Sequence, residues 1–248
     1  HGLLRRQRQM CIRDSHKENA HMRECFSLQN SLQKLGHEAI CWGLGHESFN
    51  KNKKMYLERD IDVLFCLENY NSGWLPEDIG ESKALKVFWS IDSHCALSEH
   101  VTFCNNFKPQ IHLNSTQGYL KHYEKSSEKQ YWFPNAVDTR WFRPKNIEKD
   151  KGIVFAASPI SDRVKLSQFL NRIVGLELIS NTKGEDYIDL LNRSNVSFNK
   201  SISDDINYRV FESLACGTPL VTNHVPGLEQ LLVCLLYTSP SPRDRSSS

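Results

Sequence analysis

Apolar positions in the first half of the chain recur with the spacing of helices and with the unbroken runs of buried strands. From Met22 onward, apolar residues at positions 25, 28, 32 and 35 follow the spacing of an amphipathic helix, and Gly36 is a suitable left-handed stop. Nearly continuous apolar runs such as IDVLFCL predict strands that are covered on both faces. The pattern predicts strands over 38–42, 61–67, 85–91, 110–113 and 130–133, a short polar helix after Pro76 and a helix over 116–124.

A break in this pattern separates a second series of alternating elements. Residues 134–144 hold two prolines and no periodicity, and residues 146–151 are strongly charged, as is typical of an interdomain linker. Beyond it, the pattern predicts strands over 152–157, 176–180, 195–199 and 218–222, and helices over 161–173, 185–192, 206–215 and 227–232.

Strands that alternate with helices favour parallel sheets joined by right-handed crossovers. Two such series predict an α/β protein with two doubly wound, Rossmann-like domains, an N-terminal one over residues 16–144 and a C-terminal one over residues 145–233. Because ligands of such sheets bind beyond the carboxyl ends of the strands, we expect the functional site where the two domains face each other.

The two ends of the chain do not belong to this pattern. Residues 5–15 (RRQRQMCIRDS) and 234–244 (CLLYTSPSPRD) match in-frame translations of the two strands of a transposase-type sequencing adapter. We therefore predict that residues 1–15 and 234–248 are adapter-derived artefacts flanking a metagenomic fragment, and they are set aside as tags would be. The remainder would be truncated at both ends, without its opening strand and terminal helices, so we expect exposed sheet edges and a poorly soluble or inactive chain.

The charge balance changes once the two ends are removed. The whole chain has 31 Lys and Arg against 29 Asp and Glu, a formal net charge of +2, but the terminal segments alone carry +4. The remaining residues are therefore at −2, and we expect no nucleic-acid partner.

Hydropathy and the distribution of cysteines indicate the cellular location of the protein. The longest apolar run considered, residues 231–236, is far shorter than the roughly 18 residues of a spanning helix, so we expect no transmembrane segment. The cysteines outside the terminal segments form no C-x-x-C pair and lie mostly in apolar runs, which favours free thiols in a reducing, cytoplasmic location. They are Cys25, Cys41, Cys66, Cys95, Cys104 and Cys216.

The most specific motif lies in the second predicted domain, where residues 207–222 read NYRVFESLACGTPLVT and PGLE follows shortly after. Val210 and Leu214 would bury one face of a helix, while Glu212 projects from another. Gly227 would present backbone N–H groups at a helix start, where a phosphate or sugar oxyanion is stabilised.

This motif resembles that of the retaining GT-B glycosyltransferases, and it is most similar to the CgeB-like (spore-maturation-protein-like) branch with its N-x-R-x-F-E-x-x-A-x-G pattern. The resemblance extends over residues 16–233 and includes LGHE at 35–38, WSIDSH at 89–94 and FPNAVDTRWFRP at 133–144. It implies a GT-B fold, a nucleoside diphosphate-sugar as donor substrate, and neither a cofactor nor a metal ion.

The resemblance also implies roles for residues of the motif. Glu212 corresponds to the carboxylate that binds the hydroxyls of the donor ribose, and a carboxylate suits a vicinal diol because it accepts two hydrogen bonds. Asp204 falls on the first acidic position of the family, near the transferred sugar, where Glu is usual. Arg209 and Asn207 precede Glu212 and are placed for phosphate or sugar contacts.

Cations after the first strand of the second domain are candidates for the leaving group. Arg163 and Lys165 lie in SPISDRVK, a partial match to the family's G-x-x-x-x-x-R segment. Negative charge develops on a nucleoside diphosphate as the glycosidic bond breaks, and cations there would stabilise it without a metal. An exposed helical turn is the alternative interpretation of both residues.

Candidate acceptor-side residues follow the buried strand LKVFWSI in the first domain. Asp92 and His94 stand at its carboxyl end, where they could orient an acceptor hydroxyl, contact the sugar or act together as a base. A structural hydrogen bond is the alternative for the histidine. The D-x-D spacing of Asp60 and Asp62 starts a core strand and is discounted as a metal site, so we expect none.

Two classes of function remain open. The leading hypothesis is a hexosyl-type glycosyltransferase that moves sugar from a nucleoside diphosphate-sugar to a glycan, protein or small-molecule acceptor, with retention and without a metal. The alternative is a non-catalytic GT-B-like protein that binds a nucleotide sugar or glycan, for which Asp204 in place of Glu is the one indication. A sugar-nucleotide epimerase on the same fold is a weaker third option.

Overall fold

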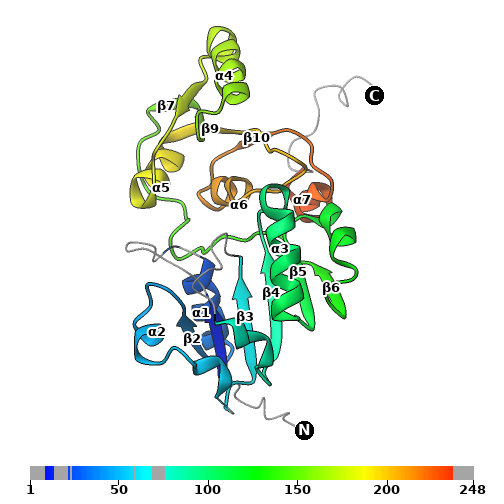
Figure 1. Ribbon diagram of the computed structural model, residues 1–248. Coiled ribbons are helices and arrows are strands. Elements are labelled where there is room, and N and C mark those ends of the chain that lie inside the picture. The colour runs from blue at the N-terminus through cyan, green and yellow to red at the C-terminus, as the bar shows by residue number, and fades with distance from the viewer. Residues whose placement is uncertain (1–8, 14–21, 23, 59, 69–75, 237–248) are drawn as a thin grey trace, which may run out of the picture.

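In the computed structural model, which describes residues 9–13, 22, 24–58, 60–68 and 76–236, the chain forms two parallel sheets with helices packed against them (Figure 1). The N-terminal sheet has six strands in the order β2-β1-β3-β4-β5-β6, and the C-terminal sheet has four in the order β10-β9-β7-β8. Every pairing between these strands is parallel. The predicted α/β architecture with two Rossmann-like sheets is confirmed.

The elements of the N-terminal half carry the first sheet. The strands are β1 (Gln9–Arg13), β2 (Glu38–Trp42), β3 (Val63–Leu67), β4 (Leu85–Ser90), β5 (Ile111–Asn114) and β6 (Lys129–Trp132). The α-helices are α1 (Glu24–Lys34), α2 (Glu47–Lys51) and α3 (Ser93–Phe107), and the short 3-10 helices are η1 (Met55–Leu57), η2 (Glu77–Glu81) and η3 (Gln117–Tyr123).

The elements of the C-terminal half alternate strictly. The strands are β7 (Lys151–Ala156), β8 (Glu177–Ile179), β9 (Ser194–Asn199) and β10 (Leu220–Thr222), and the helices are α4 (Ser161–Val174), α5 (Gly184–Arg193), α6 (Tyr208–Ala215) and α7 (Leu228–Leu236). No helix among the described residues is long and apolar enough to cross a membrane.

The expectation that the first sheet lacks its opening strand is wrong. Residues 9–13, which we predict to derive from an adapter, form β1 between β2 and β3, with Met10 opposite both Ala39 and Val63. Strand pairing uses backbone groups, so an extended segment of suitable length can satisfy the edges of β2 and β3 that would otherwise stay unpaired. The pairing leaves the origin of residues 1–15 a prediction.

Several elements of the N-terminal half differ from the sequence pattern, and the short helices α2 and η1 were not expected. The helix expected over 116–124 is the 3-10 helix η3, and the 15-residue helix α3 was not predicted at all. The buried residues of α3 are Ser93, Ala96, His100, Cys104 and Phe107. Since a histidine stands in the middle of these buried residues, the apolar periodicity that announces a helix is interrupted.

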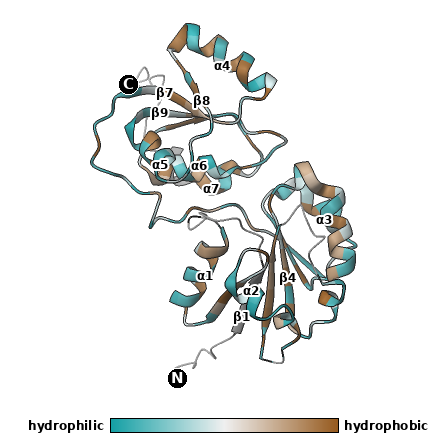
Figure 2. Ribbon diagram, turned by 60° about the vertical axis from the view of Figure 1, so that its left-hand side comes forward, coloured by the Kyte–Doolittle hydropathy of each residue, from teal (hydrophilic) through white to brown (hydrophobic). Residues whose placement is uncertain are grey.

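Each half has its own apolar core on both faces of its sheet. In the N-terminal half, one core contains Trp42, Leu64, Phe88 and Phe107, and the opposite core packs beneath α1. The inner strand β3 is accordingly hydrophobic along its whole length (Figure 2). In the C-terminal half, α5 and α6 pack on the side nearer the N-terminal sheet, whereas α4 stands at the outer end (Figures 1 and 2).

The connector between the sheets packs mainly on the C-terminal half. It holds no helix or strand, as predicted, and its Trp141 and Phe142 join Ile188, Leu191 and Cys216 in one apolar cluster. The two halves also touch directly. Trp132, at the end of β6, packs against the apolar cluster that includes residues of α6 and α7. These contacts hold the carboxyl ends of the two sheets against a shared cleft.

Candidate active site

Two adjoining cavities lie at the carboxyl ends of the strands. The first cavity, of about 240 Å³, is confined to the C-terminal half, and the second, of about 280 Å³, lies between the halves. Arg209 and Glu212, one turn apart on α6, line both cavities. A ligand longer than either cavity could therefore extend through both while touching the same two side chains.

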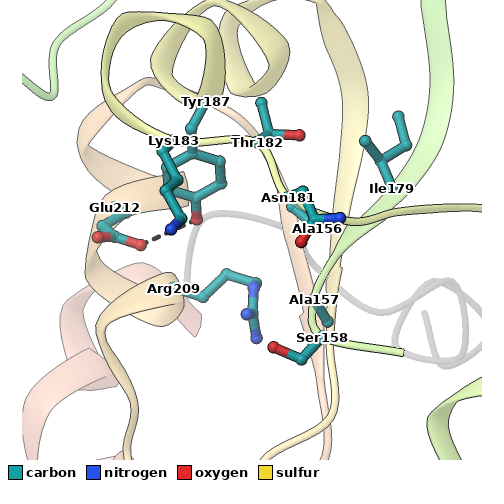
Figure 3. A pocket seen from close by; sticks show the side chains of 10 residues that line it. All are labelled: Ala156, Ala157, Ser158, Ile179, Asn181, Thr182, Lys183, Tyr187, Arg209 and Glu212. Atoms are coloured by element: carbon teal, nitrogen blue, oxygen red, sulfur yellow. Dashed lines mark hydrogen bonds between the residues drawn. The ribbon is translucent and has the colours of Figure 1, made fainter. Parts of the chain in front are cut away.

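The first cavity is formed by the ends of β7 and β8, the start of α5 and the middle of α6. Figure 3 shows Arg209 and Glu212 across from the side chains that follow the strands. Its lining residues are Ala156, Ala157, Ser158, Ile179, Asn181, Thr182, Lys183, Tyr187, Arg209 and Glu212. Small and polar side chains at strand ends leave room for a flat, partly polar ligand.

Glu212 is the carboxylate of this cavity, and Tyr187 of α5 is its direct partner. The Tyr187 hydroxyl donates a hydrogen bond of 2.8 Å to Glu212 Oε2 (Figure 3). Burial raises the pKa of Glu212 to about 7, while the bond from Tyr187 and the charge of Arg209 oppose that rise. Because the pKa of Glu212 lies near 7, a ligand that donates hydrogen bonds to its carboxylate would stabilise the anionic form.

Arg163 and Arg209 form a pair of guanidinium groups against one aromatic ring. Their Cζ atoms lie 6.0 Å and 5.6 Å from the centre of the Phe155 ring. Arg209 donates to Asn199 Oδ1 at 2.7 Å, but the buried Nε atoms of both arginines have no hydrogen-bond partner among the described residues. Burial and the neighbouring Arg209 lower the pKa of Arg163. Two partly desolvated cations with unmet donors are suited to a multiply charged anion.

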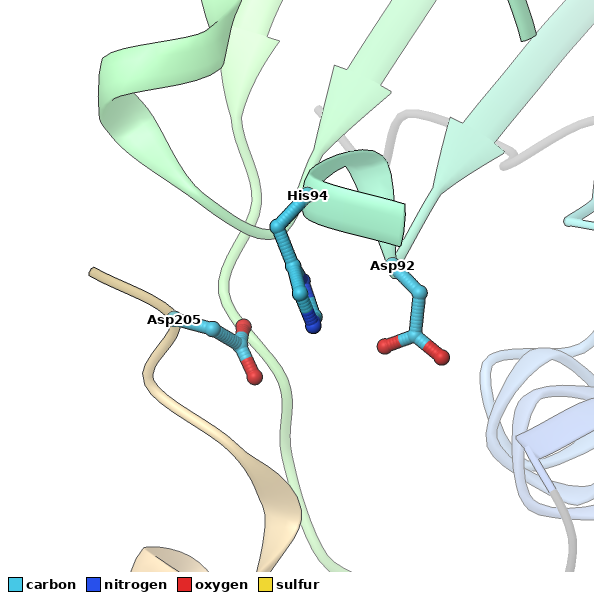
Figure 4. A group of neighbouring side chains, drawn as sticks. All are labelled: Asp92, His94 and Asp205. Carbon is cyan, nitrogen blue, oxygen red and sulfur yellow. The ribbon is translucent and has the colours of Figure 1, made fainter. Parts of the chain in front are cut away.

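Three side chains from the two halves meet on the other side of the second cavity. Asp92 and His94 come from the start of α3, and Asp205 comes from the segment before α6, with the imidazole between the carboxylates (Figure 4). Asp205 is buried and accepts a hydrogen bond of 3.2 Å from Thr116 Oγ1. Burial raises the pKa of Asp205 to about 6, an effect that His94 opposes.

Atoms of Asp92, His94 and Asp205 lie within 4.8 Å of one another, close enough to hold a metal ion between them. A metal ion there would need water or substrate to complete its coordination. A histidine beside carboxylates also suits proton exchange with a bound hydroxyl, which needs no metal. The absence of a metal in the reaction stays a prediction.

A buried network holds the turn that carries Asp92. The Glu68 carboxylate accepts hydrogen bonds from the backbone N–H groups of Ile91 and Asp92, and its other oxygen lies 3.1 Å from His100 Nε2. His100 in turn contacts the Tyr123 hydroxyl at 3.2 Å. Because these side chains are almost completely buried, the turn has little freedom to move.

The structure brings together six of the nine residues that the sequence singled out. Asp92, His94, Arg163, Asn207, Arg209 and Glu212 all line the second cavity. Asn207 caps the start of α6 and directs its Nδ2 toward Asn199 Oδ1 at 3.2 Å, and its buried Oδ1 has no partner among the described residues.

The other three residues line neither cavity. Lys165 is exposed on α4, and Asp204 is exposed with a left-handed φ of 60°. Ser203 before it is also left-handed, and this double turn directs the next residue, Asp205, inward instead. Gly227 faces Trp132: a Cβ atom there would lie 3.1 Å from its ring, so the glycine serves the contact between the halves.

Several lining residues with titratable groups were missed by the sequence analysis, among them Asp205, Tyr187 and Lys183. Asp205 stands next to the position that the family pattern selects, and only its burial distinguishes it from Asp204. Tyr187 lies on the apolar side of an amphipathic helix, where an aromatic residue indicates core rather than site. Lys183 lies in a loop without a motif.

Comparison with known proteins agrees with this geometry. Residues 160–242 match the model of the glycosyl transferase-like family. No curated protein gives a significant match.

Two solved structures are similar over most of the chain. AviGT4, a glycosyltransferase involved in avilamycin A biosynthesis, is 14% identical with a TM-score of 0.57, covering 89% of this chain and 80% of that one. Sucrose-phosphate synthase from Thermosynechococcus elongatus is 13% identical with a TM-score of 0.58, covering 91% and 84%. The chain therefore has the fold of the GT-B glycosyltransferases, and its C-terminal part matches the glycosyl transferase-like family.

Proposed function

We propose that the protein is a glycosyltransferase that takes a sugar from a nucleoside diphosphate-sugar and transfers it to an acceptor hydroxyl. The observation that carries this proposal is that Arg209 and Glu212 line two adjoining cavities, one within the C-terminal half and one between the halves. A nucleotide sugar has the matching order of groups, since its diphosphate lies between the nucleoside and the sugar.

The nucleoside would occupy the first cavity. There the ionised Glu212 accepts hydrogen bonds from the ribose hydroxyls, while the small residues 156–158 leave space for the base. The diphosphate would lie against Arg163 and Arg209, whose unmet N–H groups supply charge-assisted hydrogen bonds. The sugar then extends into the second cavity.

The acceptor would approach from the N-terminal half. As the bond between the anomeric carbon and the diphosphate breaks, its electron pair passes to the phosphate oxygen, and the two arginines stabilise the charge. The acceptor oxygen forms the new bond to the anomeric carbon, and its proton passes to the pair of Asp92 and His94 acting as base. Asp92 and His94 are placed to orient that hydroxyl, and Asp205 is placed to contact the sugar, the role first expected of Asp204.

Finer assignments depend on the resemblance of the motif NYRVFESLACGTP. It supports membership in the CgeB-like branch, transfer of a hexose-type sugar with retention, and a reaction without a metal ion, for which the arginine pair provides the alternative source of positive charge. The cysteines whose side chains the structure describes are free thiols, which supports a reducing, cytoplasmic location.

Replacing Glu212 tests the central assignment. We expect Glu212→Ala to weaken the binding of a nucleoside diphosphate by about 10-fold or more, because hydrogen bonds to a charged group contribute about 1.5–3 kcal/mol. Isothermal titration calorimetry with UDP, GDP, ADP and dTDP measures this, and Glu229→Ala, at an exposed carboxylate on α7, is the matched control. Equal affinity of Glu212→Ala and the unchanged chain would remove Glu212 from the donor site.

A non-catalytic nucleotide-sugar-binding protein remains the second candidate, because Asp204 at the first acidic position of the family is exposed and lines neither cavity. The two candidates differ in turnover. A transferase releases the nucleoside diphosphate when donor and acceptor are supplied together, whereas a binding protein retains the intact donor.

A further inference from the structure

Tyr187 contacts the carboxylate on which the proposed function depends, and no part of the family motif includes it. It lies in the first turn of α5, and its hydroxyl reaches 2.8 Å from Glu212 Oε2 on α6. The two residues are 25 positions apart in the chain, so the contact exists only in the folded protein. Figure 3 shows the ring directed from α5 into the first cavity.

The Tyr187 ring is held in place from two sides. It packs edge-on against Phe142 of the connector, with ring centres 6.1 Å apart, and it belongs to the cluster that contains Ile188, Leu191 and Cys216. It also packs against the cluster of Val154, Ala156 and Leu190 beneath β7. A buried ring between two apolar clusters has few alternative positions for its hydroxyl.

Tyr187 also keeps its proton, since burial and the charge of Glu212 raise the pKa of its hydroxyl well above the usual value. It is therefore a fixed donor to one oxygen of Glu212. A carboxylate has about four lone pairs, so one such bond sets its orientation and leaves the second oxygen for ligand hydroxyls.

We propose that Tyr187 is a positioning residue of the donor site, which orients Glu212 and favours its anionic form for binding the ribose diol of a nucleotide. The inference rests on the proposed function of Glu212. Tyr187 itself need not touch the ligand, and its effect is transmitted through the carboxylate.

The charged and titratable groups around Glu212 determine how the affinity for the donor depends on pH. Tyr187 of α5 and Arg209 of α6 favour the anion, and Glu24 of α1 opposes it. Cys216, which directly follows α6, and Lys183 stand nearby. Because the pKa of Glu212 is raised to about 7, donor affinity should increase as the pH rises through about 7. The pH at half of this increase is the midpoint of the binding profile. Removing the hydrogen bond from Tyr187 raises the pKa of Glu212 further and therefore shifts the midpoint to higher pH.

The stability of the free protein should change in the opposite direction. A carboxyl group whose folded-state pKa exceeds its unfolded-state value binds more protons when folded. Its contribution therefore favours folding as the pH falls from about 7 toward 4.5 and is lost as the pH rises again. A purely structural tyrosine would alter the overall stability without moving the midpoint for ligand binding.

The test is Tyr187→Phe, which deletes only the hydroxyl, with Tyr131→Phe at an exposed tyrosine as control. Calorimetry with a nucleoside diphosphate that binds the unchanged chain is carried out from pH about 5.5 to about 8.5, a window that spans a pKa of about 7. We expect Tyr187→Phe to weaken binding about 5- to 10-fold at neutral pH, as the loss of one hydrogen bond predicts, and to raise the midpoint. Tyr131→Phe should change neither.

An unchanged midpoint in Tyr187→Phe overturns the inference, even if the melting temperature falls. If Tyr187→Phe does not fold, Phe142→Leu, which loosens the ring without touching Glu212, should move the midpoint in the same direction. The variant Glu212→Gln distinguishes a failure of the proposed function from a failure of the role of Tyr187. Normal affinity of Glu212→Gln would refute the proposed function, whereas weak affinity of Glu212→Gln with a normal Tyr187→Phe would refute the role of Tyr187 alone.

Discussion

The turn with Asp92, on the N-terminal side of the cleft, uses a buried carboxylate to fix its backbone, whereas the arginine pair on the C-terminal side keeps N–H groups available to a ligand. The turn with Asp92 is held by Glu68, which accepts two backbone hydrogen bonds and pairs with His100. Across the cleft, Arg163 and Arg209 keep buried Nε atoms without a partner among the described residues.

The difference separates polar groups that stabilise the fold from polar groups that are available for binding. A buried polar group without a partner is costly, so satisfied groups are expected wherever only structure is at stake. The unmet N–H groups of Arg163 and Arg209 belong to side chains that line the second cavity, where a ligand would complete them. The N-terminal half instead gains a rigid turn that fixes the backbone of Asp92 at the edge of the cleft.

The largest effect is expected on the N-terminal side. Glu68→Ala should lower the free energy of unfolding by about 3 kcal/mol, because it leaves a buried histidine and two backbone N–H groups without their partner. Urea denaturation measures the change, with Glu99→Ala at an exposed position of α3 as control. A loss below about 1 kcal/mol, the range of an exposed ion pair, would mean that the network does not hold the turn.

An intermediate effect is expected on the C-terminal side, and on binding rather than folding. Arg209→Met should weaken nucleoside diphosphate binding by about 2 kcal/mol, or about 30-fold, through the loss of charge-assisted hydrogen bonds. Calorimetry at two salt concentrations measures it, and Arg193→Met, which removes an exposed arginine paired with Asp150, is the control. If both arginine variants bind equally well, the pair on Phe155 is not the diphosphate site.

The smallest effect is expected from Lys165, because this side chain is exposed and lines neither cavity. Lys165→Ala should change the affinity for nucleoside diphosphates by less than about twofold, which is within the range of ordinary surface substitutions. The same titration detects it. A loss as large as that of Arg209→Met would show that Lys165 reaches the diphosphate in the bound state.

Local patterns were sufficient for most of the strands. Nearly continuous apolar runs such as 61–67 and 85–91 correspond to β3 and β4, since strands covered on both faces bury most of their side chains. The motif over 207–219 likewise placed Arg209 and Glu212 one turn apart on one helix, and that spacing alone puts them at one site.

Helix α3 and the acidic residue of the site could not be read in this way. The buried residues of α3 include His100, whose partner Glu68 is far away in the chain. Asp204 and Asp205 are adjacent and chemically identical, and the left-handed turn at 203–204 determines which of them faces the cavity. Neither fact has a local sequence signal.

The sequence by itself determined the two parallel sheets and the helix with Arg209 and Glu212, because periodicity and short motifs act over a few neighbouring residues. Only the tertiary structure decided that Tyr187 orients Glu212, that Glu68 holds the turn with Asp92 and that Asp205 enters the cleft. Each of those contacts joins segments distant in the chain, and their distances depend on how the sheets and helices pack as a whole.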